Sequence, residues 1–177
     1  LVNGQDTPTK GWIDDISTDY AIEFLKGRKD SAKPWLLVVG FKSPHGPFEP
    51  AARAKERFAG EQARAVPNLN SPVPYLGATR RNRTDDPAAT VPVNLDYFRC
   101  ISGADDCLGR LLDALDELDL ARNTVVIYTS DNGYYLGEHG LGDKRSAYDE
   151  SLRVPFIVRD PTLGAAARGR VIDDMVL

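Results

Sequence analysis

Cysteine is scarce in this sequence, with two residues among 177, at positions 100 and 107. A pair of cysteines cannot form the disulfide framework that staples small secreted domains. Cys100 and Cys107 also fall seven positions apart in a predicted helix, about 10 Å along its axis, which is too far for a bridge. We therefore expect two buried thiols on an apolar helix face, and the cysteine content does not identify a cellular compartment.

Long apolar runs and an excess of basic residues are also missing. No apolar stretch approaches the roughly 18 residues of a membrane span, so none is predicted. The formal net charge is −4, which gives no reason to expect a nucleic-acid partner. A starting methionine and a signal-peptide pattern are absent as well. Both ends look cut, so we expect residues 1–177 to be part of a longer protein.

What the chain does contain is the pattern of a layered α/β domain, in a composition typical of globular proteins. Residues 94–120 carry an apolar stripe at spacings of three and four, which predicts a long helix with its acidic residues toward solvent. The helix leads into a β-branched run at 124–129, predicted as a buried strand, and a second apolar strand is expected at 154–158. A helix that feeds a parallel strand is half of a βαβ unit.

The N-terminal half adds a helix and a further strand. Capping residues at 17–19 predict a helix that ends at Lys26. Residues 35–41 are apolar without alternation, as expected for a strand that is buried on both faces. A short helix is predicted at 51–60, and the proline-rich residues 61–92 are expected to form an extended excursion.

The connection between the two C-terminal strands is long and rich in charge, glycine and histidine. Asp131 and Asn132 come directly after the first of these strands and offer a carboxylate and an amide oxygen, the donors that calcium prefers. Asp, Asn and Gly also favour turns, so a plain turn is the alternative. Because open α/β sheets bind ligands at strand ends, this connection is the candidate active site.

Three cationic or protonatable side chains lie on loops that follow two different predicted strands. His45 stands in a stiff, proline-rich loop after residues 35–41, and Lys144 and His139 stand in the long connection. Such donors beside a metal suit a tetrahedral oxyanion, either sulfate or phosphate. For His45 the alternative is a surface histidine with an incidental hydrogen bond. The sequence has no Walker-type glycine loop, no G-x-S-x-G elbow and no zinc-spaced Cys/His cluster.

Together these motifs closely resemble the sulfatases of the alkaline-phosphatase superfamily. Ser-Asp-Asn-Gly after a strand is followed by Leu-Gly-Glu-His-Gly-Leu, Asp-Lys-Arg and Arg-Val-Pro within residues 130–155. The Gly-Phe-Lys-Ser-Pro-His-Gly-Pro-Phe segment at 40–48 is similar to the family's central Pro-His loop. The resemblance runs from about residue 12 to residue 177. This variant of the motifs is most similar to N-acetylglucosamine-6-sulfatases and mucin-desulfating-type sulfatases.

The resemblance implies a fold and a set of roles. It implies a three-layer α/β/α sandwich in which residues 1–177 form part of the catalytic domain, without its N-terminal strands and without the C-terminal subdomain. Asp131 and Asn132 resemble two of the calcium ligands. His45 and Lys144 resemble the residues that hold the sulfate and help to protonate the leaving alcohol. His139 is a candidate sugar contact.

The implied function is that of a sulfuric ester hydrolase acting on a sulfated small molecule or glycan in the periplasm, in the lysosome or outside the cell. The family's nucleophile is a formylglycine made in a C/S-x-P-x-R motif. No Cys or Ser of this sequence begins that motif, so we expect it in an N-terminal segment and expect residues 1–177 alone to be inactive. The alternatives are a phosphoesterase or phosphonate hydrolase of the same superfamily, or an inactive segment that only binds anions or glycans.

Overall fold

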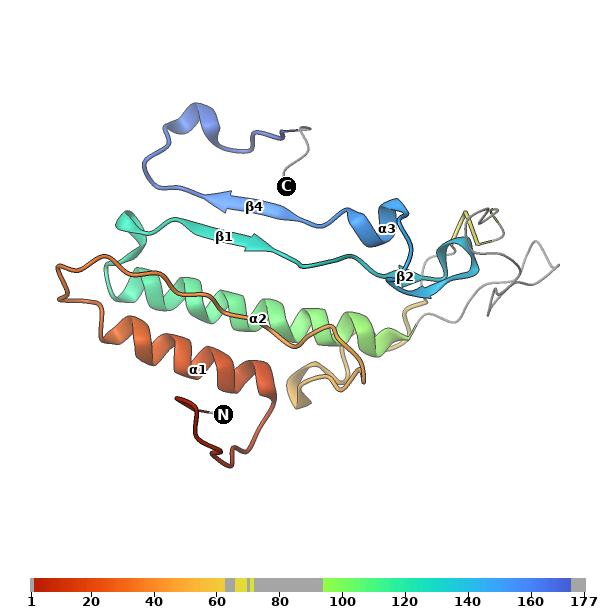
Figure 1. Ribbon diagram of the computed structural model, residues 1–177, viewed down its shortest axis with the longest axis horizontal. Helices are drawn as coiled ribbons and strands as arrows, with labels where there is room; N and C mark the ends of the chain where they lie inside the picture. The colour runs from red at the N-terminus through yellow and green to blue at the C-terminus, as the bar shows by residue number, and fades with distance from the viewer. Residues whose placement is uncertain (1, 63–65, 70, 72–93, 173–177) are drawn as a thin grey trace.

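The computed structural model describes residues 2–62, 66–69, 71 and 94–172 of the chain. Its core lies between two long helices, α1 (Ile13–Lys26) and α2 (Leu95–Glu117), which lie side by side (Figure 1). Leu25 from α1 packs with Ala114 and Leu115 from α2 in a buried cluster near the C-terminal ends of both helices. The helices form one layer, and the strands lie over one side of it.

The helix predicted at 94–120 is present as α2, and its beginning has a local cause. The Asn94 side chain accepts a hydrogen bond from the backbone N–H of Asp96 at 2.9 Å, which satisfies one of the free donors of the first turn. The acidic residues predicted to face solvent are exposed, namely Asp113, Asp116, Glu117 and Asp119. The C-terminal half of the apolar stripe packs on the core, with Leu115 buried, whereas Ile101 nearer the start of the helix is 37% exposed.

Helix α1 begins earlier than the sequence suggests. It starts at Ile13 after Trp12, instead of at a cap within residues 17–19. Ser17 and Thr18 lie inside the helix, and their hydroxyls donate to backbone carbonyls four residues earlier, at 3.0 and 2.7 Å. The prediction of the start was wrong because a hydroxyl residue can bond back along a helix as well as cap one.

Two strands form the larger ribbon, and they run antiparallel. β1 (Val126–Thr129) pairs with β4 (Phe156–Arg159), with Val126 opposite Arg159. Both elements confirm the strands predicted at 124–129 and 154–158, although each begins two residues later. The expected burial and the parallel pairing are not found among the described residues. Ile127 is 57% exposed because only one side of the ribbon is covered by the helices.

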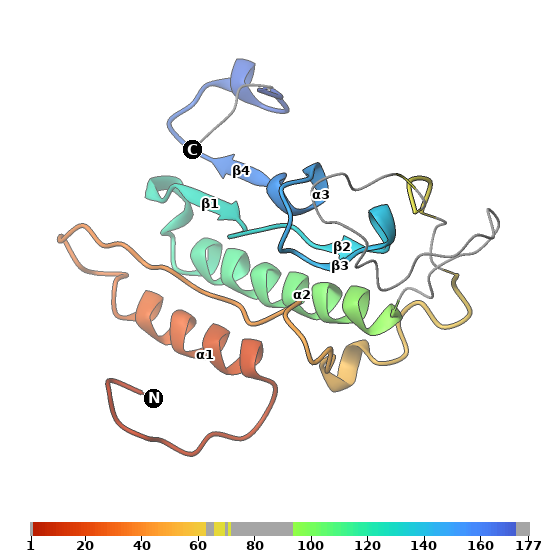
Figure 2. The ribbon, with the colours of Figure 1, turned by 45° about the vertical axis from the view of Figure 1, so that its right-hand side comes forward.

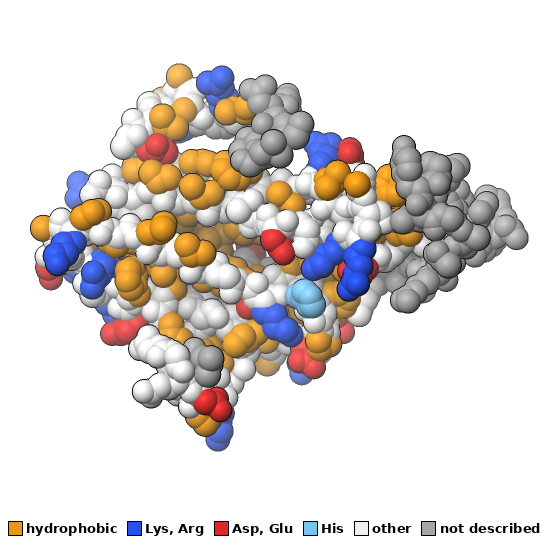
Figure 3. All heavy atoms as spheres, in the orientation of Figure 1, with side chains coloured by type: hydrophobic (Ala, Val, Ile, Leu, Met, Phe, Trp, Pro, Cys, Tyr) orange, Lys and Arg blue, Asp and Glu red, His pale blue; other side chains and the backbone are white. Residues whose placement is uncertain are grey.

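Residues 35–41 are extended, but they form no strand pairing in the described part of the chain. Trp35 and Leu37 pack on the helix core, whereas Leu36 and Val38 are 85% and 82% exposed. Burial on both faces was therefore a wrong prediction for this segment, which covers the helices with alternate side chains. Figure 3 shows the result: rows of hydrophobic side chains lie exposed over this segment and over β1 and β4.

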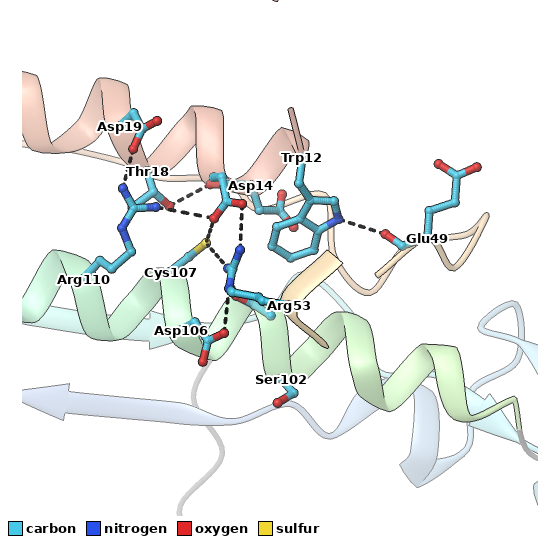
Figure 4. A network of polar contacts seen from close by, with 12 residues as sticks. Trp12, Asp14, Thr18, Asp19, Glu49, Arg53, Ser102, Asp106, Cys107 and Arg110 are labelled. Atoms are coloured by element: carbon cyan, nitrogen blue, oxygen red, sulfur yellow. Dashed lines mark hydrogen bonds and ion pairs between the residues drawn. The ribbon is translucent and has the colours of Figure 1, made fainter. Parts of the chain in front are cut away.

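A network of ion pairs ties α1, α2 and the segment after the Pro-His loop together (Figure 4). Arg53 donates to Asp15 at 2.7 Å and to Asp106 at 2.8 Å. Arg57 adds a second pair to Asp106 at 2.9 Å, and Arg110 reaches Asp15 at 3.4 Å. Burial raises the pKa of Asp15, but hydrogen bonds and charge from its partners outweigh it and hold that pKa below its usual value.

The remaining elements are short. They are a 3-10 turn at Ala52–Ala54, another at Ala121–Asn123, β2 (Tyr135–Leu136), a 3-10 turn at Glu138–Gly140, β3 (Gly142–Asp143), α3 (Asp149–Leu152) and a last 3-10 turn at Ala165–Ala167. β2 pairs antiparallel with β3 beyond the end of β1 (Figure 2). The helix predicted at 51–60 is reduced to the 3-10 turn at Ala52–Ala54, and Phe58 and Gly60 beyond it take positive φ angles of 61° and 81°, which a helix does not allow.

The remaining predictions concern the burial of the cysteines, a membrane-spanning helix and the proline-rich excursion. Cys100 and Cys107 are free thiols with 2% and 0% exposure, which confirms the buried pair. No helix in the described ranges is long and apolar enough to cross a membrane. Most of the excursion predicted at 61–92 lies outside the described residues.

Candidate active site

The turn that carries Asp131 and Asn132 follows β1 directly. Ser130 Oγ donates to the Asn132 carbonyl at 2.9 Å, and Asn132 Nδ2 donates to the carbonyl of Gly133 at 2.8 Å. The amide nitrogen of Asn132 is thus held by the backbone of its own turn, which leaves Oδ1 as the group open to a ligand. Asp131 is exposed, and its carboxylate has no hydrogen bond within the described ranges.

Gly133 fixes where this turn lies. Its backbone N–H donates to the carbonyl of Ser151 at 2.8 Å. A Cβ at position 133 would lie 2.0 Å from the backbone carbonyl oxygen of Glu150. The turn therefore packs directly on the backbone of the α3 segment, and this approach requires a residue without a side chain.

A cavity of about 380 Å³ brings the turn together with the loop after β3. It is lined by Asp131 and Asn132 from the turn and by Lys144, Arg145 and Ser146 from the loop. Two residues predicted as metal ligands and one predicted as a sulfate contact thus border one space. Residues from opposite ends of the long connection meet here because Gly133 and Ser151 join its two arms.

The cavity is lined by charges of both signs, with Lys144 and Arg145 on one side and Asp131 on the other. Arg145 Nε pairs with Asp143 at 2.8 Å, in a bridge whose arginine side chain is 87% exposed. Lys144 has no ion-pair partner in the described part of the chain. Its ammonium group is therefore available to a ligand, and an oxyanion such as sulfate is the chemical class that it suits.

The donor types of Asp131 and Asn132 fit a hard cation. One carboxylate and one amide oxygen are calcium donors, but calcium takes six to eight oxygens. The described residues contain no cluster of three or more Asp, Glu, His or Cys side chains that could hold a metal by itself. These two residues therefore fit part of a calcium site, and the other oxygens must come from elsewhere.

His45 lies in a different hollow, of about 220 Å³, which is also lined by Lys42, Ser43 and Cys100. The structure does not place it among the residues that line the cavity at Asp131. Its ring is exposed, and its Nδ1 lies 2.8 Å from the carbonyl oxygen of Gly46. Because a carbonyl can only accept, this contact places a proton on Nδ1 and leaves Nε2 for a ligand.

The Pro-His loop is held at its start by a buried carboxylate. Asp14 is 0% exposed, and its two oxygens accept from the backbone N–H groups of Lys42 at 2.7 Å and Ser43 at 3.1 Å. The loop then closes through the N–H of His45, which donates to the Lys42 carbonyl at 2.8 Å. The helix α1 thereby sets the position of the histidine.

His139 is part of a packed polar cluster. Its ring stacks on Tyr148 with centroids 4.3 Å apart, and its Nε2 lies 3.7 Å from Glu150 Oε2 and 3.4 Å from Asn68 Nδ2. Its backbone φ is 56°, between two glycines that also have positive φ. His139 Nδ1 and the Tyr148 hydroxyl are buried without a hydrogen-bond partner in the described structure.

Comparisons with known proteins identify the family. The sequence profile named Sulfatase matches residues 2–175. The chain belongs to the sulfatase family. It is 33% identical to human iduronate 2-sulfatase over 175 residues, which covers 88% of this chain and 32% of that protein. It is 27% identical to N-acetylglucosamine-6-O-sulfatase from Bacteroides thetaiotaomicron over 223 residues, covering 90% of this chain and 40% of that protein.

A solved structure shows that this sulfatase chain shares its fold with known proteins. BT4656, determined in complex with its substrate D-glucosamine-2-N,6-O-disulfate, superposes with a TM-score of 0.71 at 24% identity, covering 90% of this chain and 45% of that one. The helices and strands described above are compatible with an α/β fold of this kind. The chain spans about a third of the length of the first curated relatives that it matches.

Sequence reasoning missed several residues that shape the site. Asp14 was read as outside the helix, so nothing indicated that its carboxylate would reach Lys42 and Ser43. Tyr135 was taken as part of a polar connection, yet it is 1% exposed and makes hydrogen bonds across the loop. The one available signal was a pair of adjacent tyrosines in an otherwise charged stretch.

Proposed function

We propose that the protein containing this chain is a calcium-dependent sulfatase that hydrolyses sulfate esters of glycans. One observation supports this above all: in a chain of the sulfatase family, the Asp131–Asn132 turn and Lys144 line the same cavity. In this proposal residues 1–177 belong to one catalytic domain, a three-layer α/β/α sandwich whose other strands, and whose formylglycine nucleophile, are supplied by residues outside this chain.

The role proposed for Lys144 follows from its charge and position. Its ammonium group has no ion-pair partner in the described ranges, and it borders the cavity at the turn. It would bind the sulfate oxygens and neutralise the negative charge that grows on them in the transition state. Lys144 would contribute to binding and catalysis in this way because an ammonium group forms charge-assisted hydrogen bonds with sulfate oxygens.

His45 is proposed to bind the sulfate group and to protonate the departing alcohol. The contact from Nδ1 to the Gly46 carbonyl fixes the ring, so Nε2 is the atom that would carry the transferred proton. A histidine suits this work because its usual pKa lies near neutral pH. Asp14 supports the assignment, since it fixes the backbone from which His45 projects.

Asp131 and Asn132 would supply two of the oxygens that hold calcium. A bound calcium ion supplies positive charge that stabilises the sulfate oxygens. Asp131 would provide a charged ligand, and Asn132 would provide Oδ1, because its Nδ2 is engaged with the Gly133 carbonyl. The exposed position of Asp131 leaves its carboxylate open to the ion and to further ligands.

The proposed substrate is a sulfated saccharide, with glucosamine 6-sulfate and related glycans as the first candidates. Both curated relatives named above are sulfatases of sugar units, and the solved neighbour holds a sulfated glucosamine. His139 is the proposed saccharide contact, held in the polar cluster with Tyr148 and Glu150.

The test uses the full-length protein with calcium and a panel of 4-nitrophenyl sulfate, 4-nitrophenyl phosphate, a phosphonate ester and sulfated glucosamines. We expect sulfate esters to be hydrolysed and chelation to abolish the activity. Lys144→Ala and His45→Ala should each lower kcat/KM by roughly two orders of magnitude. Lys29→Ala is the control, because it removes an exposed lysine that lines neither of the two hollows.

Near-native activity in either variant would contradict the role of that residue. Preference for phosphate or phosphonate esters over sulfate esters would replace the proposal with the phosphoesterase alternative. Residues 1–177 alone are expected to be inactive, and hydrolysis by that segment would show that the nucleophile lies within it.

A further inference from the structure

A buried hydroxyl joins the two arms of the candidate site. Tyr135 is 1% exposed, and its phenol oxygen lies between three partners. It donates to the carbonyl of Ser146 at 2.7 Å, accepts from the backbone N–H of Tyr148 at 3.2 Å, and contacts Ser151 Oγ at 3.1 Å. Ser151 Oγ also donates to the Ser146 carbonyl.

The same group of residues reaches the turn on the other side. The carbonyl of Ser151 accepts the backbone N–H of Gly133 at 2.8 Å, one residue after Asn132. Ser146 stands two residues after Lys144, and both line the cavity. The contacts among Gly133, Tyr135, Ser146 and Ser151, here called the tyrosine clasp, therefore connect the predicted calcium turn with the predicted sulfate-binding loop.

We propose that the Tyr135 hydroxyl is a positioning group that holds the Lys144 loop in register with the Asp131–Asn132 turn. The inference rests on the proposed function for its catalytic consequence, but it names a residue that touches neither sulfate nor metal. The loop that carries Lys144 has only the two-residue β2–β3 pairing as regular structure. Its position therefore depends on side-chain hydrogen bonds, and Tyr135 supplies the most buried of them.

The chemistry of the clasp suits positioning. A tyrosine hydroxyl both donates and accepts, so the Tyr135 oxygen can bond the Ser146 carbonyl and the Tyr148 N–H at once. Both partners are backbone groups, which fixes the path of the chain and not only a side chain. A displacement of about 1 Å at a catalytic group costs up to two orders of magnitude in rate, so even a small shift of this loop should be measurable.

The decisive experiment is a double-mutant cycle in the full-length protein with a sulfate ester as substrate. Tyr135→Phe keeps the buried ring and removes the hydroxyl, and we expect kcat/KM to fall about tenfold. In the Lys144→Ala background the same change should have less than about a twofold effect, because there is no longer an ammonium group to position. Equal effects in both backgrounds would mean that Tyr135 acts through stability alone and would overturn the proposal.

Tyr134→Phe is the matched control. Tyr134 is the neighbouring tyrosine, it stacks on Tyr97, and its hydroxyl makes no hydrogen bond in the described structure. Its loss should leave kcat/KM within about twofold of the wild type, the agreement expected for a hydroxyl outside the clasp. Should Tyr135→Phe fail to fold, Ser151→Ala removes the opposite side of the clasp and should show the same dependence on Lys144.

Hydrogen exchange separates this inference from the proposed function. The amides of residues 142–148 should exchange faster in Tyr135→Phe than in the wild type and in Tyr134→Phe. If the wild type hydrolyses no sulfate ester but these amides exchange faster in Tyr135→Phe, the proposed function fails and the positioning role stands. If the wild type is active while Tyr135→Phe retains full activity and full protection, the positioning role fails and the function stands.

Discussion

The carboxylate of Asp14 allows a direct test of what holds the Pro-His loop in place. It is fully buried, and each of its oxygens accepts one backbone N–H, from Lys42 and from Ser43. A hydrogen bond to a charged group is worth roughly 1.5–3 kcal/mol. Asp14→Ala should therefore lower the free energy of unfolding by about 3–6 kcal/mol, a large part of the roughly 5–15 kcal/mol of a typical domain.

Two further variants show whether the lost stability comes from the hydrogen bonds of Asp14. Asp14→Asn keeps one acceptor oxygen but turns an NH2 donor toward the other backbone N–H, so it should lose more than half as much stability as the alanine variant. Asp113→Asn changes an exposed aspartate of α2 and should stay within about 0.5 kcal/mol of the wild type. Guanidinium denaturation measures all three variants on one scale.

Amide exchange shows whether the loss is local to the loop. In the wild type the N–H groups of Lys42 and Ser43 should be protected, and in Asp14→Ala they should exchange faster even under conditions where the protein stays folded. An alanine variant within 1 kcal/mol of the wild type, or unchanged exchange at these two amides, would refute the reasoning. The loop would then have to be fixed by its other contacts, such as the hydrogen bond from the His45 N–H to the Lys42 carbonyl.

Three other outcomes follow from the same structure. Gly103→Ala should destabilise the protein by about 1–3 kcal/mol, because its Cβ would lie 2.9 Å from the Trp12 ring. Gly109→Ala in the same helix meets no atom within 4 Å and should stabilise the protein by about 0.5–1 kcal/mol. Thermal unfolding of the two variants checks both signs. The part of the stability that Asp15 contributes should be fully present above about pH 5 and be lost as the pH falls through 3.8 and below, because the pKa of Asp15 in the folded protein lies below its usual 3.8. Asp15→Asn should remove this part of the pH dependence of the free energy of unfolding. Burial raises the pKa of both cysteines, so a thiol reagent at pH 8 should leave Cys100 and Cys107 unmodified in the folded protein and modify both after denaturation, as peptide mapping would show. Rapid reaction of either thiol in the folded state would contradict this.

The sequence predicted those parts of the fold that depend on local patterns. The long helix α2 could be found because its apolar residues recur at helical spacing and Asn94 can cap it. The start of α1 could not, because Ser17 and Thr18 have the same chemistry whether they cap a helix or bond back inside it. The burial of residues 35–41 was overestimated, because an apolar run shows that a segment has something to bury but not which of its faces is covered.

The candidate site could also be predicted only in part, from residue types and not from contacts. The turn at Asp131 and the cation Lys144 could be chosen from their residue types, and the structure places both at one cavity. The contacts that bring them together could not be chosen, since they are one backbone hydrogen bond between Gly133 and Ser151 and the side-chain hydrogen bonds of Tyr135. The assignments of calcium to Asp131 and Asn132, and of sugar binding to His139, stay predictions.

The close approach of Gly133 to the backbone of residue 150 has a use beyond this protein. Every amino acid other than glycine begins with the same Cβ, and that atom alone would overlap the Glu150 carbonyl oxygen at 2.0 Å. The restriction is therefore the same for a small residue as for a large one. A related sequence that keeps the Ser-Asp-Asn motif but has another residue in place of this glycine must have rebuilt its α3 segment, and a reader of sequences can recognise that change without a structure.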